Sequence, residues 1–204
     1  MSAGASPAAA GDGERDVLPN PYVGPRPFET GERLFGRDRE ARELLDLFIA
    51  ERIVLLYAPS GAGKTSLLRA ALIPRLRDEG FSVLPVARVS TAPPPGAAGA
   101  TNRYVLSLLR SLEEGLPPAQ QLPLEELQGV GLGAYLDRRA ALEAQAAATA
   151  GEDDGPPSQV LIVDQFEEIL TVDPGDRSAR REFFAQLGAV LRDRRRWALL
   201  SMRE

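Results

Sequence analysis

The 204-residue chain contains no cysteine and no histidine, and its 24 basic residues include a single lysine, Lys64. Without thiols or imidazoles the chain cannot form a disulfide, a zinc site of cysteine and histidine ligands, or a catalytic serine–histidine or cysteine–histidine pair. Any chemistry must therefore come from carboxylates, arginines, Lys64 and a divalent cation such as Mg²⁺.

Long hydrophobic runs are also absent. No apolar stretch approaches the roughly 20 residues of a membrane-spanning helix, and residues 1–16 are rich in alanine, glycine and serine, without the apolar core of a secretory signal. We therefore expect a cytoplasmic protein with no membrane partner.

The formal net charge is −5, and acidic and basic residues are interspersed along the chain. This pattern predicts no nucleic-acid partner. The one basic run, at 194–196, is interpreted as the solvated end of a helix.

The length and the hydrophobic content of 44% suit one sizeable core. We expect residues 1–18 to be a disordered N-terminal tail and residues 19–204 to form a single domain. Strands are predicted at 53–57, 81–89, 160–163 and 197–201. Helices are predicted after Asp38 as N-cap, at 66–73 with Pro74 ending or kinking the helix, at 104–112, at 134–150, and from Asp176 or Ser178.

The segment around Lys64 follows the pattern of a phosphate-binding loop between a strand and a helix. Gly61 and Gly63 allow positive φ angles that turn backbone N–H groups toward phosphate oxygens. Lys64 supplies a compact ammonium for the β- and γ-phosphates, and Thr65 supplies a hydroxyl for Mg²⁺. Ala58 replaces the first glycine of the pattern, at little cost if its φ is negative. The candidate binding residues are Pro59, Ser60, Gly61, Ala62, Gly63, Lys64, Thr65 and Ser66.

A second set of candidate residues follows the apolar run at 160–163, which is typical of a buried parallel strand. Ligands bind at the carboxyl ends of such strands, so Asp164 is expected to meet the magnesium ion that Thr65 also contacts. Glu167 and Glu168 are candidates to activate water, and an acidic helix start is the alternative for both. Gln165 can orient a water but hardly deprotonate it, so hydrolysis is expected to be slow.

Arg203 follows the last predicted strand, and it is expected to contact the γ-phosphate if that strand lies beside the one ending at Asp164. A surface arginine at the chain end is the alternative.

Together these segments resemble the first group of novel STAND NTPases, which are signal-transducing P-loop ATPases of the wider AAA-like class. The resemblance covers about residues 19–204, and it rests on segments at 20–28 (NPYVGPRPF), 35–40 (FGRDRE), 58–65 (APSGAGKT), 163–168 (VDQFEE) and 200–204 (LSMRE). It implies that Phe35, Gly36 and Arg37 pack against the adenine side of the nucleotide and that Arg203 is the sensor of the γ-phosphate.

The resemblance further implies a P-loop NTPase fold of class α/β, with three α/β/α layers around a mostly parallel sheet. The implied strand order is 5-1-4-3-2, and the fifth strand and the effector and sensor domains of such proteins are missing from this chain. We therefore expect a truncated product or fragment whose apolar strand at 53–57 has an unpaired edge, which favours self-association.

The leading functional hypothesis is an ATP-binding, slowly ATP-hydrolysing signalling switch that uses ATP or ADP with Mg²⁺, with ADP holding a closed form and ATP favouring self-association. The alternative is a nucleotide-dependent interaction module without hydrolysis. A small-molecule kinase ranks last, because the candidate lid at 115–133 holds no arginine to clamp phosphates. A GTPase is disfavoured because its guanine-reading motif needs a second lysine.

Overall fold

The computed structural model describes residues 26–29, 32, 34–90, 102–150 and 157–204. The expected N-terminal tail at 1–18, most of the proline-rich segment before Arg26 and the loop at 91–100 lie outside these residues. The domain boundaries therefore stay a prediction.

The described residues form one sheet of four parallel strands in the order β1-β4-β3-β2. The strands are β1 (Ile53–Ala58), β2 (Ser82–Val83), β3 (Gln159–Val163) and β4 (Arg196–Arg203). The order agrees with the 1-4-3-2 part of the predicted topology, and the predicted α/β class is confirmed.

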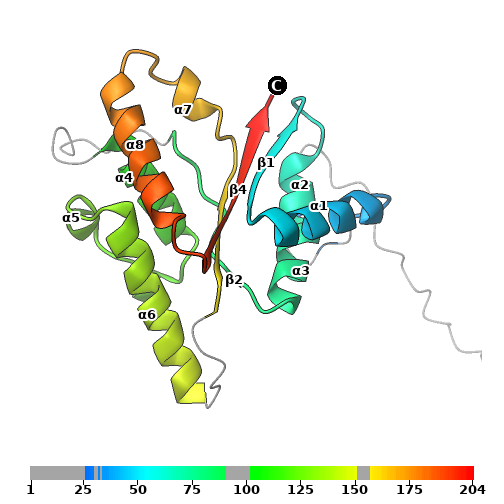
Figure 1. The fold of residues 1–204 in the computed structure, drawn as a ribbon, viewed down its shortest axis with the longest axis horizontal. Coiled ribbons are helices and arrows are strands. Elements are labelled where there is room, and N and C mark those ends of the chain that lie inside the picture. The colour runs from blue at the N-terminus through cyan, green and yellow to red at the C-terminus, as the bar shows by residue number, and fades with distance from the viewer. Residues whose placement is uncertain (1–25, 30–31, 33, 91–101, 151–156) are drawn as a thin grey trace, which may run out of the picture.

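Helices cover both faces of the sheet, which gives the three layers expected of the fold (Figure 1). One face carries α1 (Asp38–Glu51), α2 (Lys64–Ser66), the π-helical turn η1 (Leu67–Leu72) and α3 (Ile73–Asp78). The other carries α4 (Arg103–Glu114), α6 (Leu132–Ala150) and α8 (Arg177–Val190), with the shorter η2 (Pro118–Gln120), α5 (Leu124–Leu127) and α7 (Glu168–Thr171) beside them.

Strand β3 lies at the centre of the core, and all five of its residues are buried. Leu161 and Val163 pack into the cluster with α4 and α8, whereas Val160 and Ile162 pack into the cluster with α1 and η1. A strand that is apolar on both faces is the form expected inside a parallel sheet. This burial fixes the register of β3, and with it the position of the residue that follows, Asp164.

The helix after the phosphate-binding loop does not end at Pro74, contrary to one of the two predicted outcomes. It continues through α3 to Asp78, with Pro74 near the start of that segment. The preceding turn is π-helical, and the N–H of Ile73 bonds to the carbonyl of Leu68. Because proline lacks an N–H and crowds the carbonyl of the preceding turn, a widened turn directly before it lets the helix continue.

Other element boundaries were also predicted wrongly. Strand β2 covers only Ser82–Val83, since Pro85 removes a ladder donor, and Ala87 then forms an isolated bridge to Val163. Arg37, rather than Asp38, is the N-cap of α1, and it makes no capping hydrogen bond through its side chain.

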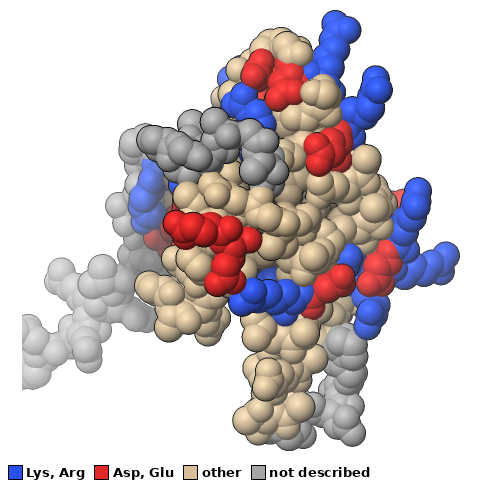
Figure 2. All heavy atoms as spheres, turned by 90° about the vertical axis from the view of Figure 1, so that its left-hand side faces the viewer, with Lys and Arg blue, Asp and Glu red and all other residues tan. Residues whose placement is uncertain are grey.

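The basic run at 194–196 is not a helix end as interpreted from sequence, because α8 ends at Val190 and Arg196 already begins β4. The Arg196 side chain is only 12% exposed and pairs with Asp137 of α6. Figure 2 shows arginine and acidic side chains intermingled on the face that carries α4, α6 and α8. In the part of the chain that is described, no helix is both long and apolar enough to cross a bilayer.

Arg52 ties the start of β1 to the turn before β4. Its backbone has a φ of 65°, and its Nη1 donates to the carbonyls of Leu191, Asp193 and Arg196 at 2.8, 3.0 and 2.9 Å. Three carbonyls on one guanidinium hold β1 and β4 in register, so the ends of both strands reach the same edge of the sheet.

Candidate functional site

The loop between β1 and α2 adopts the backbone conformation that its glycines predict. Gly61 and Gly63 have φ angles of 78° and 76°, in the left-handed region that favours glycine. A Cβ added at Gly63 would lie 3.0 Å from Nη1 of Arg37, so this glycine also lets Arg37 approach the loop closely.

A cavity of about 330 Å³ opens over this loop. Its walls come from three parts of the chain: the loop with the start of its helix, the carboxyl ends of β3 and β4, and a short N-terminal segment. The lining residues are Arg26, Pro27, Ser60, Gly61, Ala62, Gly63, Lys64, Thr65, Ser66, Asp164, Gln165, Glu167 and Arg203. The predicted loop residues thus share one cavity with Asp164, Glu167 and Arg203, while Pro59, Glu168, Phe35, Gly36 and Arg37 are not part of its lining.

Thr65 and Asp164 meet directly, although they are 99 positions apart in the sequence. The Thr65 hydroxyl Oγ1 donates to Oδ2 of Asp164 at 2.6 Å, and Oδ1 of Asp164 accepts from the backbone N–H of Gln165 at 3.0 Å. Asp164 is only 3% exposed. A buried carboxylate beside a hydroxyl on the phosphate-binding loop is the arrangement that the sequence predicts.

The Lys64 ammonium lies over the start of the loop. Its Nζ donates to the carbonyls of Ala58 at 2.7 Å and Pro59 at 3.1 Å. An ammonium has three protons, so these two bonds fix its position and leave a third donor for an anion in the cavity.

The two candidate glutamates have different surroundings. Glu167 lines the cavity, and its Oε2 accepts from the backbone N–H of Arg203 at 3.0 Å. Glu168 begins α7 and accepts a hydrogen bond from the hydroxyl of Ser90. The structure therefore brings Glu167 to the loop and engages Glu168 elsewhere.

Arg203 lies in β4 and lines the cavity. The sequence placed this residue beyond the strand, whereas β4 continues through it opposite Ala58 of β1. Strands β3 and β4 are neighbours, so the condition on which Arg203 could approach the γ-phosphate is met.

Arg37 contacts the loop from outside the cavity, and its Nη1 donates to the carbonyl of Ala62 at 2.6 Å. Phe35 is 43% exposed and Gly36 has a φ of 76°. The contact of these residues with adenine stays a prediction. The contact that the structure shows is the hydrogen bond from Arg37 to the loop backbone.

Sequence reasoning left Arg26 and Pro27 out of the site, and it expected Gln165 to orient a water without counting it among the site residues. All three line the cavity. Gln165 has a φ of 55°, which is uncommon for a residue other than glycine and is found at functional sites. The available signal for Arg26 was the proline-stiffened segment at 20–28. That Arg26 and Pro27 line the cavity over the loop is evident only from the fold.

The oxygen donors present suit Mg²⁺, which favours few protein ligands and keeps several waters or phosphate oxygens. Thr65 and Asp164 would hold it. Across the described ranges no group of three or more acidic side chains forms a self-sufficient metal cage. A cation here would therefore depend on the ligand's own oxygens.

Comparison with solved structures finds a Walker-type ATPase of Pyrococcus abyssi with a TM-score of 0.57 and 18% sequence identity. The match covers 88% of this chain and 48% of that one, so the chain spans about half the length of this neighbour. At this identity the likeness shows the fold. Comparison with curated proteins gave no match.

The model of the family Novel STAND NTPase 1 matches residues 21–204, which include the phosphate-binding loop, Asp164 and the last strand. The chain therefore belongs to the Novel STAND NTPase 1 family of nucleotide-binding proteins.

Proposed function

We propose that the chain is an ATP-binding, slowly ATP-hydrolysing switch module, formed by the domain at 19–204. The observation that carries the proposal is the 2.6 Å hydrogen bond between Thr65 and Asp164 inside the cavity over the loop. A hydroxyl beside a carboxylate supports the proposal, because a magnesium-bound triphosphate needs oxygen ligands of this kind.

Each residue of the cavity has a separate task in this proposal. The loop N–H groups and Lys64 bind the β- and γ-phosphates, while Thr65 and Asp164 hold Mg²⁺, which neutralises charge on the phosphate oxygens when bound. One oxygen of Glu167 accepts the Arg203 N–H, and the other can take a proton from an attacking water. The Arg203 side chain reports the γ-phosphate.

The residues next to Asp164 support the proposal that hydrolysis is slow. Gln165 is the first cavity residue after it, and an amide can orient water but cannot remove its proton. The carboxylate of Glu167 is also shared with a backbone N–H. The same observations support the alternative, an interaction module that binds ATP without hydrolysing it. Phosphate release that disappears in Glu167→Gln would exclude that alternative.

The switch is proposed to work in the cytoplasm through self-association or through effector and sensor domains. Support comes from β1, which pairs with β4 and with no other strand of the described residues. Ile53, Leu55 and Tyr57 are 43%, 56% and 54% exposed on this edge strand. An exposed apolar edge is a template for pairing with another strand.

Nucleotide-dependent stabilisation tests the site. A ligand at 100 times its dissociation constant stabilises a fold by about 2.7 kcal/mol, so ADP and Mg²⁺ should raise the melting temperature measurably. Lys64→Ala should abolish this shift. Lys64→Arg keeps the charge but not the compact ammonium, and it should abolish the shift as well. An unchanged shift in Lys64→Ala would refute the site.

A further inference from the structure

Residues 26–29, here called the N-terminal strap, are fixed to the helix that follows the phosphate-binding loop. The backbone N–H of Phe28 donates to Oγ of Ser66 at 3.1 Å. Nη1 of Arg69 donates to both carboxylate oxygens of Glu29, at 2.8 and 2.9 Å. These two contacts hold the strap against the helix whose first residues are proposed to bind phosphate.

The strap brings an arginine to the cavity. Arg26 lines it, and its guanidinium also forms a two-point pair with Glu32 at 2.6 and 2.8 Å. Glu32 accepts a further bond from the N–H of Glu29 at 2.7 Å, and the pKa of Glu32 is lowered to about 2 by the Arg26 guanidinium and this N–H. Glu32 therefore stays ionised at neutral pH and keeps its hold on Arg26.

The Arg26–Glu32 pair is easy to break. The two side chains are 50% and 34% exposed, and ion pairs in contact with water contribute little to stability. Hydrogen bonds from a guanidinium to phosphate are charge-assisted and two-pronged, as are those to a carboxylate. A phosphate chain in the cavity can therefore compete with Glu32 for the same guanidinium.

The charges of the cavity lining also favour a contact between Arg26 and a bound polyanion. Three cations line the cavity, Arg26, Lys64 and Arg203, against two carboxylates, Asp164 and Glu167. Without Arg26 the formal charges of the lining side chains cancel, and attraction of a polyanion would depend on the loop N–H groups and the start of the helix alone. With Arg26 the lining has a net positive charge.

We propose that Arg26 is a nucleotide-binding residue that contacts the phosphate chain. Glu32 pairs with the Arg26 guanidinium and competes with the nucleotide for it. The inference rests on the proposed function of the same cavity. It makes the N-terminal strap part of the nucleotide site, so that binding breaks the pair of Arg26 with Glu32.

The side from which Arg26 enters the cavity indicates which phosphates of the nucleotide it contacts. Arg203 and Glu167 come from the carboxyl ends of β4 and β3, where the γ-phosphate is expected, whereas Arg26 comes from the strap anchored at Ser66. Arg26 therefore contacts phosphates that ADP and ATP share, and its loss weakens both nucleotides by the same factor.

Calorimetric titration of the full chain with ADP, and with ATP under conditions of negligible hydrolysis, tests the inference. Arg26→Gln should weaken both nucleotides about tenfold, as expected for the loss of one charge-assisted contact. Glu32→Gln should strengthen both by removing the competitor. The matched control is Arg39→Gln, which removes an arginine of another exposed pair, Arg39–Glu43 at 2.7 Å on α1, and should change neither affinity.

The two substitutions in one ion pair thus have opposite expected effects. If the pair only fastened the strap, Arg26→Gln and Glu32→Gln would weaken binding together, and that result overturns the inference. Equal affinities in Arg26→Gln and Arg39→Gln would overturn it too. In either case tight ADP binding by the parent chain and its loss in Lys64→Ala would leave the proposed function standing. If the parent chain bound no better than Lys64→Ala, both would fall.

Discussion

At the scale of the residue, single hydrogen bonds orient the side chains of the candidate site. Two of these hydrogen bonds join residues far apart in the sequence, Thr65 to Asp164 and the N–H of Arg203 to Glu167. A third set joins Lys64 to two carbonyls at the sharp turn of the loop. Each contact orients a charged or polar side chain before any ligand arrives. Such preorganisation is what makes a hydrogen-bonding group effective toward developing charge.

The two glutamates give a sharp prediction of function. Since Glu167 lines the cavity and Glu168 is held by Ser90, Glu167→Gln should lower the rate of phosphate release by about 100-fold or more, the usual contribution of a general base. Glu168→Gln is the matched control and should keep most of the rate. Both should bind ADP like the parent chain. A larger loss of phosphate release in Glu168→Gln than in Glu167→Gln would contradict the assignment and make Glu168 the general base.

How well individual residues could be predicted depended on how local their signal was. The loop residues can be recognised from sequence, because the glycines, the lysine and the threonine lie within one short segment. Asp164 can be recognised because it follows an apolar run. Arg26 could not be found this way, since its place depends on the contact of Phe28 with Ser66, 38 positions away. The separate surroundings of Glu167 and Glu168 depended likewise on Arg203 and on Ser90.

At the scale of the element, caps and packing determine where helices begin. Oδ1 of Asn102 accepts from the N–H groups of Tyr104 and Val105 at 3.1 and 3.2 Å, which caps α4. Its Nδ2 donates to the carbonyl of Ala179 in α8 at 2.6 Å. One side chain thus starts a helix and fastens it to its neighbour.

We expect Asn102→Ala to destabilise the fold by about 1–2 kcal/mol, because a lost cap alone costs about 1 kcal/mol and the bond to α8 is lost with it. Urea unfolding without nucleotide measures the change. Asp176→Ala, which removes the cap of α8 without such a cross-link, is the comparison and should cost less. A smaller effect of Asn102→Ala than of Asp176→Ala would show that the cross-link adds nothing.

Element prediction failed where local chemistry competed with tertiary structure. The apolar periodicity found the strand at 160–163 and the long helices, but it left open whether the helix ends or kinks at Pro74, and a π-helical turn lets the helix continue. The segment at 81–89 looked like one strand, yet Pro85 limits its ladder to Ser82–Val83 and one bridge at Ala87. Both outcomes depend on where proline leaves a backbone group without a donor.

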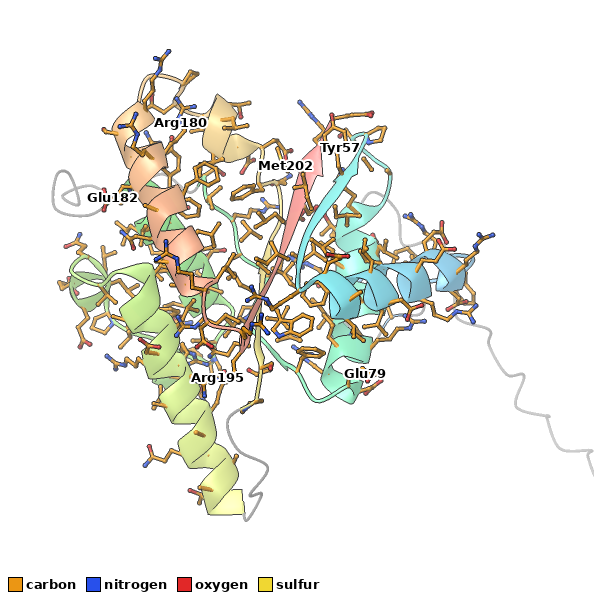
Figure 3. All side chains as sticks on the ribbon, in the orientation of Figure 1. Tyr57, Glu79, Arg180, Glu182, Arg195 and Met202 are labelled. Carbon is orange, nitrogen blue, oxygen red and sulfur yellow. The ribbon has the colours of Figure 1, made fainter. Side chains whose placement is uncertain are left out.

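For the whole molecule, the distinctive feature is the side of the sheet at β1. Ile53, Leu55 and Tyr57 pair in register with Ala198, Leu200 and Met202. Figure 3 shows Tyr57 and Met202 close together at one end of the sheet, with Glu79 and Arg195 at the other. The strand order and the unpaired edge of β1 could both be predicted from the family resemblance, whereas the exposed fractions of its side chains required the structure.

Self-association through this edge can be tested by sedimentation over a range of concentrations. The parent chain should shift toward larger species as concentration rises, and Leu55→Lys should weaken the association, because a lysine on an edge strand opposes strand pairing. Leu142→Lys is the control, since Leu142 is 45% exposed on α6. A parent chain that stayed a single monomeric species at every concentration would contradict the prediction.

The most direct test of the account is the magnesium dependence of ADP affinity, measured by calorimetry for the parent chain and for Asp164→Ala. If Asp164 and Thr65 hold the metal against the phosphates bound by Lys64, the parent chain should bind ADP more tightly with Mg²⁺ than without it. In Asp164→Ala that difference should vanish. A full magnesium dependence in Asp164→Ala would contradict a site built from these residues.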